Sequence, residues 1–154
     1  MEWEETELDK PIITNTSDIE FRLFYEKYTK TIKIEFKGVM GIGSEGNIDS
    51  DYMREVVNLT LNKFSIKKVI LDYTNLTYEF GNSIIRVYSP LLAIPSAIIV
   101  SNKNKDGLTS LHHFYGLSKE KTITSIQGYF DTLEEGYKFL QTREIGTAYP
   151  MFSF

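Results

Sequence analysis

The stretch KKVILDY, residues 67–73, is the part of the sequence that decides the fold. Two lysines precede a continuous apolar run that ends at Asp72, a pattern typical of a central strand covered on both faces. The run SAIIVS, residues 96–101, predicts a second buried strand. Between them, residues 81–92 (GNSIIRVYSPLL) carry an apolar stripe at helical spacing until Pro90. This order indicates parallel strands joined by helical crossovers.

Further amphipathic helices flank this unit. Upstream, DSDYMREVVNLTLNKF, residues 49–64, has apolar residues at helical spacing, with Asp49 or Ser50 available as the N-cap. Downstream, DGLTSLHHFYG, residues 106–116, predicts a helix that Asp106 caps and Gly116 ends. Each helix therefore follows a strand and leads into the next one.

The end of the recognisable pattern is a short strand and a closing helix. TITSIQGYF, residues 122–130, predicts the strand. DTLEEGYKFLQ, residues 131–141, then begins with Asp131 and Glu134 at the spacing of a capping box, in which each side chain satisfies the other's exposed amide.

The N-terminal part of the pattern is a pair of alternating strands. IEFRLFYEK, residues 19–27, and TIKIEFKG, residues 31–38, each place apolar residues on one face, and the short polar break between them suggests an antiparallel hairpin. The predicted fold class is therefore α/β, with a mixed sheet in which an N-terminal antiparallel hairpin is followed by parallel strands and crossover helices.

Length and composition indicate a single globular domain over residues 1–154, with residues 1–17 and 145–154 as peripheral segments. The chain has 154 residues, of which 42% are hydrophobic and 25% charged. This length is enough to bury a core without disulfides or metals, and this balance excludes wholesale disorder.

Composition also excludes several classes of site. The absence of cysteine excludes a disulfide framework and a thiolate site. The acidic start, MEWEETELDK, is unlike a secretory signal, and no apolar run reaches the ~20 residues of a membrane helix. The net charge of -4 comes with no dense basic stripe, which argues against a nucleic-acid partner. We expect a cytoplasmic protein without membrane insertion.

The stretch GIGSEG, residues 41–46, spells the G-x-G-x-x-G fingerprint of dinucleotide-binding proteins. It follows a predicted strand and precedes a helix, and Asp72 lies where a ribose-binding acid is expected. Against this reading, the preceding strand has one wet face, Glu45 adds negative charge, and the helix is expected to begin several residues after Gly46. We interpret the motif as a strand-to-helix connection and expect no cofactor.

Four pieces of the chain, in this order and spacing, resemble the STAS domain of the anti-sigma factor antagonists. They are the glycine-containing turn leading to IDSDYMREVV (residues 48–57), KKVILDYTNLTYEFGNSIIRVY (67–88), SAIIVSNKNKDGLTSLHHFYGL (96–117) and YFDTLEEGYKFL (129–140). The resemblance covers roughly residues 30–141. It implies a non-catalytic domain that regulates by binding another protein, such as a kinase-type regulator.

The resemblance also implies a position for a phosphorylation switch. In the antagonists, a partner kinase phosphorylates a serine in an Asp-Ser-Ser-Gly turn, and the added charge at the helix N-terminus switches the partner off. The corresponding turn here runs from Phe80 to Ser83, and the usual acceptor position falls at Gly81, which has no hydroxyl. Ser83, two positions later, is the candidate phosphosite, and its alternative role is that of a helix-start residue.

The predicted contact surface is the rim from Asp72 to Ser83. Asp72 is expected at the C-terminal end of a central strand, where α/β sheets bind their ligands. Tyr78 and Phe80, on an exposed loop beside Glu79, would supply rigid contact area. The predicted partner-binding residues are Asp72, Tyr78, Glu79, Phe80 and Asn82.

Two other classes of function stay open, as does self-association. The acidic charge and small size also suit an immunity or inhibitor protein that masks a toxin. A small α/β enzyme or nucleotide-binding protein is the third class; Asp72, Ser83 and a histidine supply hydrolase residue types, but no G-x-S-x-G elbow holds the serine. His112 and His113 point about 100° apart on a helix and cannot share a metal, so no metal site is expected.

Overall fold

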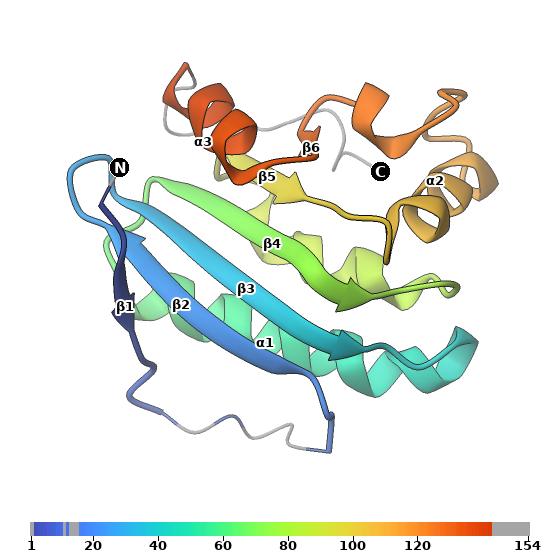
Figure 1. Cartoon of the computed structure of the whole chain (residues 1–154). Helices are drawn as coiled ribbons and strands as arrows, with labels where there is room; N and C mark the ends of the chain where they lie inside the picture. Colours follow the sequence, from blue (N-terminus) through green and yellow to red (C-terminus); the bar gives the residue numbers. More distant parts are fainter. Residues whose placement is uncertain (1, 11, 13–15, 143–154) are drawn as a thin grey trace.

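A single mixed sheet forms the centre of the computed structural model, which describes residues 2–10, 12 and 16–142 (Figure 1). Its strands, in spatial as in chain order, are β1 (Glu4–Thr6), β2 (Glu20–Glu26), β3 (Thr31–Val39), β4 (Lys68–Thr77), β5 (Ser96–Ile99) and β6 (Tyr129–Phe130). The β1–β2 and β2–β3 pairs are antiparallel, and the pairs from β3 to β6 are parallel. The predicted α/β fold, with its hairpin followed by parallel strands, is confirmed.

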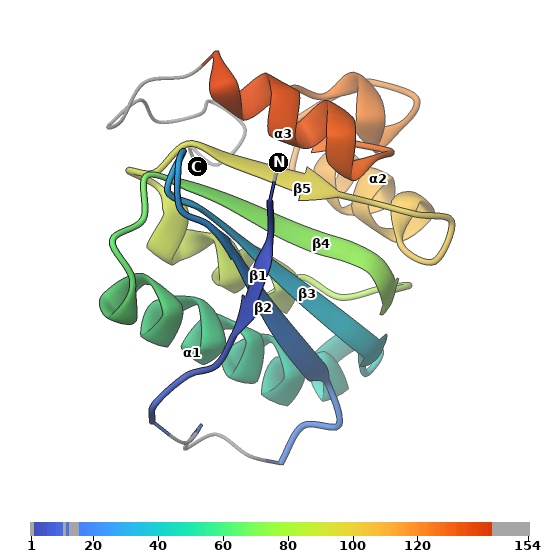
Figure 2. The ribbon, with the colours of Figure 1, turned by 60° about the vertical axis from the view of Figure 1, so that its left-hand side comes forward.

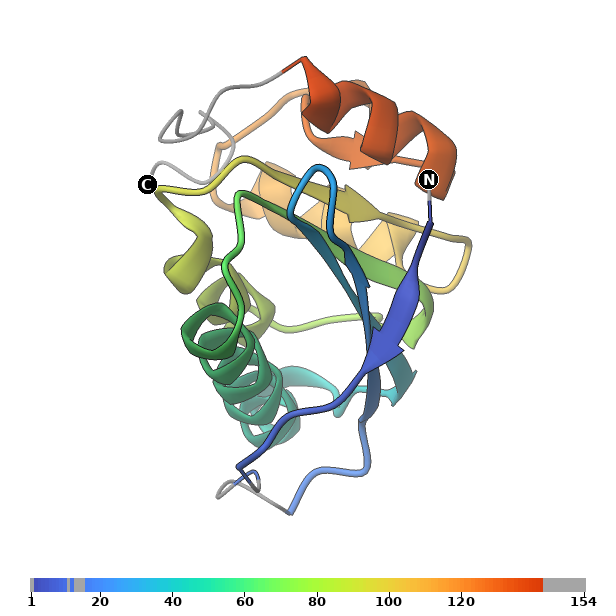
Figure 3. The ribbon, with the colours of Figure 1, turned by 90° about the vertical axis from the view of Figure 1, so that its left-hand side faces the viewer.

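Helices cover the two faces of the sheet unequally. The α-helices are α1 (Asn47–Lys63), α2 (Lys105–Phe114) and α3 (Leu133–Gln141), and the 3₁₀ helices are η1 (Gly43–Gly46), η2 (Ser83–Leu91) and η3 (Ile123–Ser125). In Figures 2 and 3, α1 lies along one face of β2, β3 and β4, whereas α3 lies beside β5. The opposite face of β2 and β3 carries no described helix, so it is the open face.

The register of the parallel strands explains which side chains form the core. Leu71, Ile98 and Tyr129 stand level on neighbouring strands and are buried, and the Tyr129 hydroxyl lies beside His112 of α2. Ile99, one residue along β5, faces α3, where a Cβ on Gly136 would lie only 2.6 Å from its Cδ1. Both faces of β4 and β5 are therefore buried, as their continuous apolar sequences require.

The first strand, β1, lies in a segment that the sequence pattern left peripheral. It pairs with β2 at the edge of the sheet, in register from Glu4 opposite Tyr25 to Thr6 opposite Leu23 (Figure 2). It brings Trp3 within 5.4 Å of Lys33 Nζ, which also lies 4.4 Å from the Phe24 ring and 2.9 Å from Glu35. Lys33, on the face of this strand that the sequence predicts to be wet, is consequently buried.

Strand β4 is longer than predicted and contains an irregularity. The sequence ends the strand near Asp72, but pairing with β3 continues to Thr77, with a register shift after Glu35 opposite Asp72. Thr74 and Asn75 are both exposed, and Leu76 returns to the core. After the shift, each following side chain lies on the face of the sheet opposite to the one that simple alternation from Asp72 would give it.

The segment after β4 is a 3₁₀ helix and not the expected α-helix. Pro90 lies inside η2 and has no amide to donate. The buried residues Ile84, Val87 and Leu91 nevertheless recur at a spacing of three or four, so the apolar stripe still faces the core.

Two predicted helix caps are wrong by a few positions. Helix α1 begins at Asn47, directly after Gly46, and neither Asp49 nor Ser50 is its N-cap. Helix α3 is capped by Thr132, which accepts a hydrogen bond from the Glu135 amide at 3.2 Å and donates to its carboxylate at 2.9 Å. The N-cap therefore lies one residue later than predicted, and the acid three residues on bonds to the Thr132 hydroxyl in place of the amide that a capping box would use. Asp131 instead forms an ion pair with Lys105.

Other expectations hold in part. Gly116 ends the α2 segment with a φ of +66°, as predicted. Residues 122–130 form η3 and the two-residue β6, so only their end is a strand. Asp106 lies in the first turn of α2, and the N-cap is Asn104. Residues 145–154 lie outside the described residues. None of the described helices is long and apolar enough to cross a membrane.

Candidate functional site

A groove of about 470 Å³ lies beyond the carboxyl ends of β3 and β4. We call it the rim groove. It is formed by the connections that follow these strands and by α2, which is the position where α/β sheets commonly bind ligands. Its lining residues are Gly43, Ser44, Asn47, Tyr78, Phe80, Gly81, Asn82, Arg86, Gly107, Ser110, Leu111 and Phe114.

Close backbone contacts between glycines shape this groove. The Gly43 amide donates to the Phe80 carbonyl at 3.0 Å, and a Cβ on Gly81 would lie 3.1 Å from the Gly43 carbonyl oxygen. On α2, a Cβ on Gly107 would lie 2.7 Å from the Tyr78 carbonyl oxygen. Three separate segments can therefore meet only because none of these positions has a side chain.

The glycines of the G-x-G-x-x-G stretch have structural roles in the turn between β3 and α1. The Gly41 amide donates to Asp49 Oδ2 at 2.7 Å, so a carboxylate of the protein occupies the N-terminus of α1. A Cβ on Gly46 would lie 2.6 Å from the Gly41 carbonyl oxygen, and Gly43 has a φ of +62°. The prediction that several residues separate Gly46 from the helix is wrong. The amides of Gly41 and Gly43 are nevertheless both taken by protein acceptors.

Tyr78 is not an exposed contact residue, contrary to its predicted role. Only 3% of it is exposed, and its hydroxyl donates to the Gly81 carbonyl. Burial raises the pKa of this phenol above its ordinary value. Because the register shift in β4 places Tyr78 on the core side, its side chain packs under the loop that contains Gly81 and forms part of the buried lining of the groove.

Phe80 and Asn82, two of the predicted partner-binding residues, line the groove, and a second aromatic residue joins them. Phe80 is 66% exposed, and Phe114, at the end of α2, is 80% exposed. The Asn82 side chain donates to the Tyr115 hydroxyl at 2.9 Å and thus joins the loop to the end of α2. Glu79 is exposed but does not line the groove.

Phe114 is not among the residues that the sequence predicts for the site. It lies three residues after the buried Leu111 but is itself exposed, and a large aromatic residue at this spacing beside a buried apolar residue is the signal that could have found it.

Asp72 lies away from the other predicted residues. It belongs to the open face of the sheet, where it lines a separate, smaller depression of about 330 Å³ with Arg22, Glu35 and Lys37. Its carboxylate accepts hydrogen bonds from the Thr74 amide at 3.0 Å and hydroxyl at 2.5 Å. The prediction that it marks the rim is wrong because β4 continues five residues beyond it.

Ser83 is buried at the start of η2. Its hydroxyl lies 2.8 Å from that of Ser50 on α1, and both residues are at least 97% buried. A kinase cannot reach this oxygen in the folded chain, so the described arrangement favours the helix-start role over the phosphosite.

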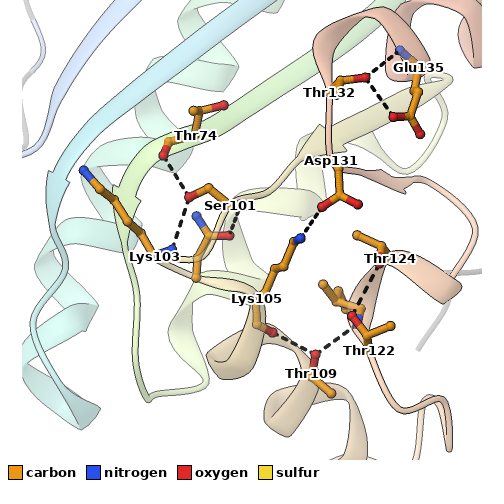
Figure 4. Close-up of polar contacts among 12 residues, drawn as sticks. Thr74, Ser101, Lys103, Lys105, Thr109, Thr122, Thr124, Asp131, Thr132 and Glu135 are labelled. Atoms are coloured by element: carbon orange, nitrogen blue, oxygen red, sulfur yellow. Dashed lines mark hydrogen bonds and ion pairs between the residues drawn. The ribbon is translucent and has the colours of Figure 1, made fainter.

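Polar contacts at the end of β5 fix the position of α2, which forms one side of the groove (Figure 4). The Ser101 hydroxyl donates to the Thr74 carbonyl at 2.8 Å, and Lys105 at the start of α2 pairs with Asp131. The buried Asn104 side chain donates to the carbonyls of Tyr73 at 2.7 Å and Leu76 at 2.9 Å. These two carbonyls flank the irregularity in β4, so Asn104 satisfies backbone groups that the strand leaves open.

The two histidines have different surroundings. His112 is 4% exposed, and its Nε2 lies 3.0 Å from the Tyr129 hydroxyl, whereas His113 is exposed. Burial, with a smaller contribution from His113, lowers the pKa of His112. Tyr88 lies in the same buried region, and burial raises its pKa to about 12. No group of three metal-ligating side chains comes together among the described residues.

Arg86 is the one charged side chain that lines the rim groove in the described part of the chain. Its Nη1 lies 3.3 Å from Asp51 Oδ1, and both side chains are about half exposed. Such a pair is weak, so the guanidinium remains able to bind a second acceptor.

No known family model matches this sequence, and a search of curated proteins gave no significant match. The reading of the site therefore depends on its geometry.

Proposed function

We propose that this chain is a non-catalytic regulatory domain that binds another protein through the rim groove. The observation that carries the proposal is the exposure of Phe80 and Phe114, which line one groove from two different elements. Large aromatic side chains at the surface are the residues that most often anchor a protein interface. The resemblance to anti-sigma factor antagonists suggests a kinase-type regulator as the partner.

The chemistry of the groove supports binding over catalysis. Its lining is mostly apolar or neutral, and the polar side chains there are Ser44, Asn47, Asn82 and Ser110, together with Arg86. Asp72 and Ser83, two components of a hydrolase-type set, lie elsewhere: Asp72 on the open face and Ser83 buried against Ser50. The arrangement offers contact area and hydrogen-bonding groups, and it assembles no nucleophile with a base.

The groove also supports a contact that does not depend on phosphorylation of Ser83. Gly81 has no hydroxyl, and the Ser83 hydroxyl is enclosed between η2 and α1. Regulation in this proposal comes from occupancy of the groove by the partner, and the exposed aromatic pair sets its affinity.

The test is affinity purification of the tagged full chain from its native cell, with quantitative mass spectrometry of the recovered proteins. With the double variant Phe80→Ser, Phe114→Ser, the amount of partner recovered should fall by about tenfold or more. Truncating a side chain that anchors an interface costs at least ~2 kcal/mol of binding free energy. Circular dichroism melting checks that the variant remains folded, which the exposure of both side chains predicts.

Tyr28→Ser is the matched control. Tyr28 is 75% exposed, and it lies in the turn between β2 and β3, at the other end of β3 from the groove. It should leave recovery of the partner unchanged. Equal recovery by the wild type and the double variant would contradict the proposal, as would equal loss from the Tyr28 variant.

A further inference from the structure

The area of the aromatic pair limits the size of its occupant. At 66% and 80% exposure, Phe80 and Phe114 together offer roughly 300 Å² of accessible surface, since an aromatic side chain buries about 150–250 Å². A stable interface between two folded proteins takes about 800 Å² from each partner. The aromatic pair therefore supplies less than half of the area that each copy would contribute to a stable dimer of this chain, and an area of this size suits a short segment of a few residues.

The shape of the groove favours apolar side chains in that segment. Leu111 and Phe114 lie on one helical face of α2, and Phe80 projects from the loop after β4. A volume of about 470 Å³ lies within the range of pockets that enclose small ligands, which have room for a small number of large side chains. An apolar side chain placed there would cover the exposed aromatic surface.

The charge of the groove adds a second requirement. Arg86 is the charged residue in its lining, and among the described residues one of its nitrogens is engaged, at 3.3 Å from Asp51. A guanidinium has five N–H donors in a planar fork, which suits a carboxylate. Exposure of about half of the Arg86 side chain leaves this fork accessible from the groove.

We infer that the occupant is a short peptide segment of the partner that carries large apolar side chains and an adjacent carboxylate, with Arg86 as the residue that selects the acid. This inference rests on the proposed function and specifies the chemistry of the partner. Arg86 is a specificity-determining residue in this account: the phenylalanines supply affinity, and the guanidinium rejects segments with a basic residue at the same position.

The test begins with a phage-displayed library of random twelve-residue peptides, selected in parallel on the full chain and on its Phe114→Ser variant. Peptides enriched on the wild type alone should contain two large apolar residues with an Asp or Glu nearby. The most enriched peptide is then synthesised with a fluorophore, and its binding is followed by fluorescence anisotropy at physiological salt. Arg86→Glu should weaken binding by about tenfold.

Two controls make the charge effect specific. Arg54→Glu makes the same charge change on an exposed residue of α1 that does not line the groove, and it should alter affinity less than about twofold. A peptide whose acid is replaced by lysine should bind the wild type weakly and recover affinity for Arg86→Glu. This reciprocal recovery requires a direct pairing and not a loss of fold.

The outcomes separate the two proposals. Groove-dependent peptides without an acidic preference, or an Arg86→Glu variant that binds as the wild type does, would overturn the inference and leave the proposed function standing. Identical selections on the wild type and Phe114→Ser would overturn both. Analytical ultracentrifugation supplies the last arm: a wild-type dimer that Phe114→Ser dissociates would show that a second copy covers the groove, which contradicts the inference.

Discussion

The carboxylate of Asp49 accepts a hydrogen bond from the Gly41 amide at 2.7 Å and another from the Ser17 hydroxyl at 2.7 Å. One side chain in the first turn of α1 thus joins the helix to the end of β3 and to the segment that leads into β2. It also places a negative charge at the positive end of the α1 dipole.

Asp49→Ala should lower the free energy of unfolding by about 1–3 kcal/mol, because it removes an ionised acceptor from two donors. Urea denaturation followed by circular dichroism measures the change. Asp51→Ala is the control: its acid lies on the same helix but is about half exposed in a weak pair, so its removal should cost less than about 1 kcal/mol. Equal shifts in the two midpoints would contradict this account.

Asn104→Ala should destabilise the chain more than its position in a loop suggests. The Asn104 side chain donates to the Tyr73 and Leu76 carbonyls and accepts from the Ser101 amide at 3.0 Å, all in a buried position. Leaving these groups unpaired should cost about 2–4 kcal/mol in urea denaturation. Asn102→Ala, at an exposed position two residues earlier, should leave the midpoint nearly unchanged. A small effect of Asn104→Ala would mean that water replaces its bonds.

The sheet could be predicted because its determinants are local. The alternation of residues 19–27 and 31–38 and the continuous apolar run of residues 67–73 each specify a strand and the number of its faces that are buried. β1 was missed because three residues, Glu4–Thr6, are too short to show a period. Its place depends on pairing with β2, a contact distant in sequence.

The rim could be predicted only in part, because its geometry follows from non-local events. The register shift in β4 moves Tyr78 from the exposed face to the buried face of the sheet, and no local sequence pattern predicts the shift. The groove also needs α2, whose Phe114 lines the same groove as Phe80 although more than thirty positions of the chain separate them. The position of Phe80 and Asn82 at the rim could be predicted because loop residues after a strand of an α/β sheet commonly face it.

Glu26 should make stability depend on acid pH. Burial acts to raise the pKa of this carboxyl, but hydrogen bonds from Thr29 and from the Tyr28 amide lower it below the ordinary value of 4.5. The folded chain therefore holds the ionised form more strongly than the unfolded chain does. This contribution is present above pH 4.5 and is lost as the pH falls through the lower pKa of the folded state.

Glu26→Gln should consequently lower the free energy of unfolding at neutral pH by about 1–3 kcal/mol, and with it the melting temperature, since its amide is a poorer acceptor for the turn. The difference from the wild type should shrink as the pH is lowered from 6 towards 3, in thermal melts at each pH. Glu5→Gln provides the comparison, because Glu5 is exposed in its pair with Arg22 and should shift the neutral-pH midpoint far less. A difference that is constant across this range would contradict the assignment.

His112 should impose a second pH dependence at a higher pH. It lies buried beside Tyr129, in the region of Tyr88 and next to His113, and burial lowers its pKa below 6.5. As the pH falls below 6.5, the unfolded chain therefore takes up a proton at His112 before the folded chain does, and stability declines. His112→Gln keeps a partner for the Tyr129 hydroxyl without titrating, so its urea midpoint should fall less between pH 7 and 5 than that of the wild type.

His113→Gln, at the exposed neighbouring position, is the control and should keep most of the wild-type decline in the urea midpoint. Nitrogen-15 spectra of the folded chain supply the direct readout: a His112 ring that is already charged at pH 6.5 would refute the prediction.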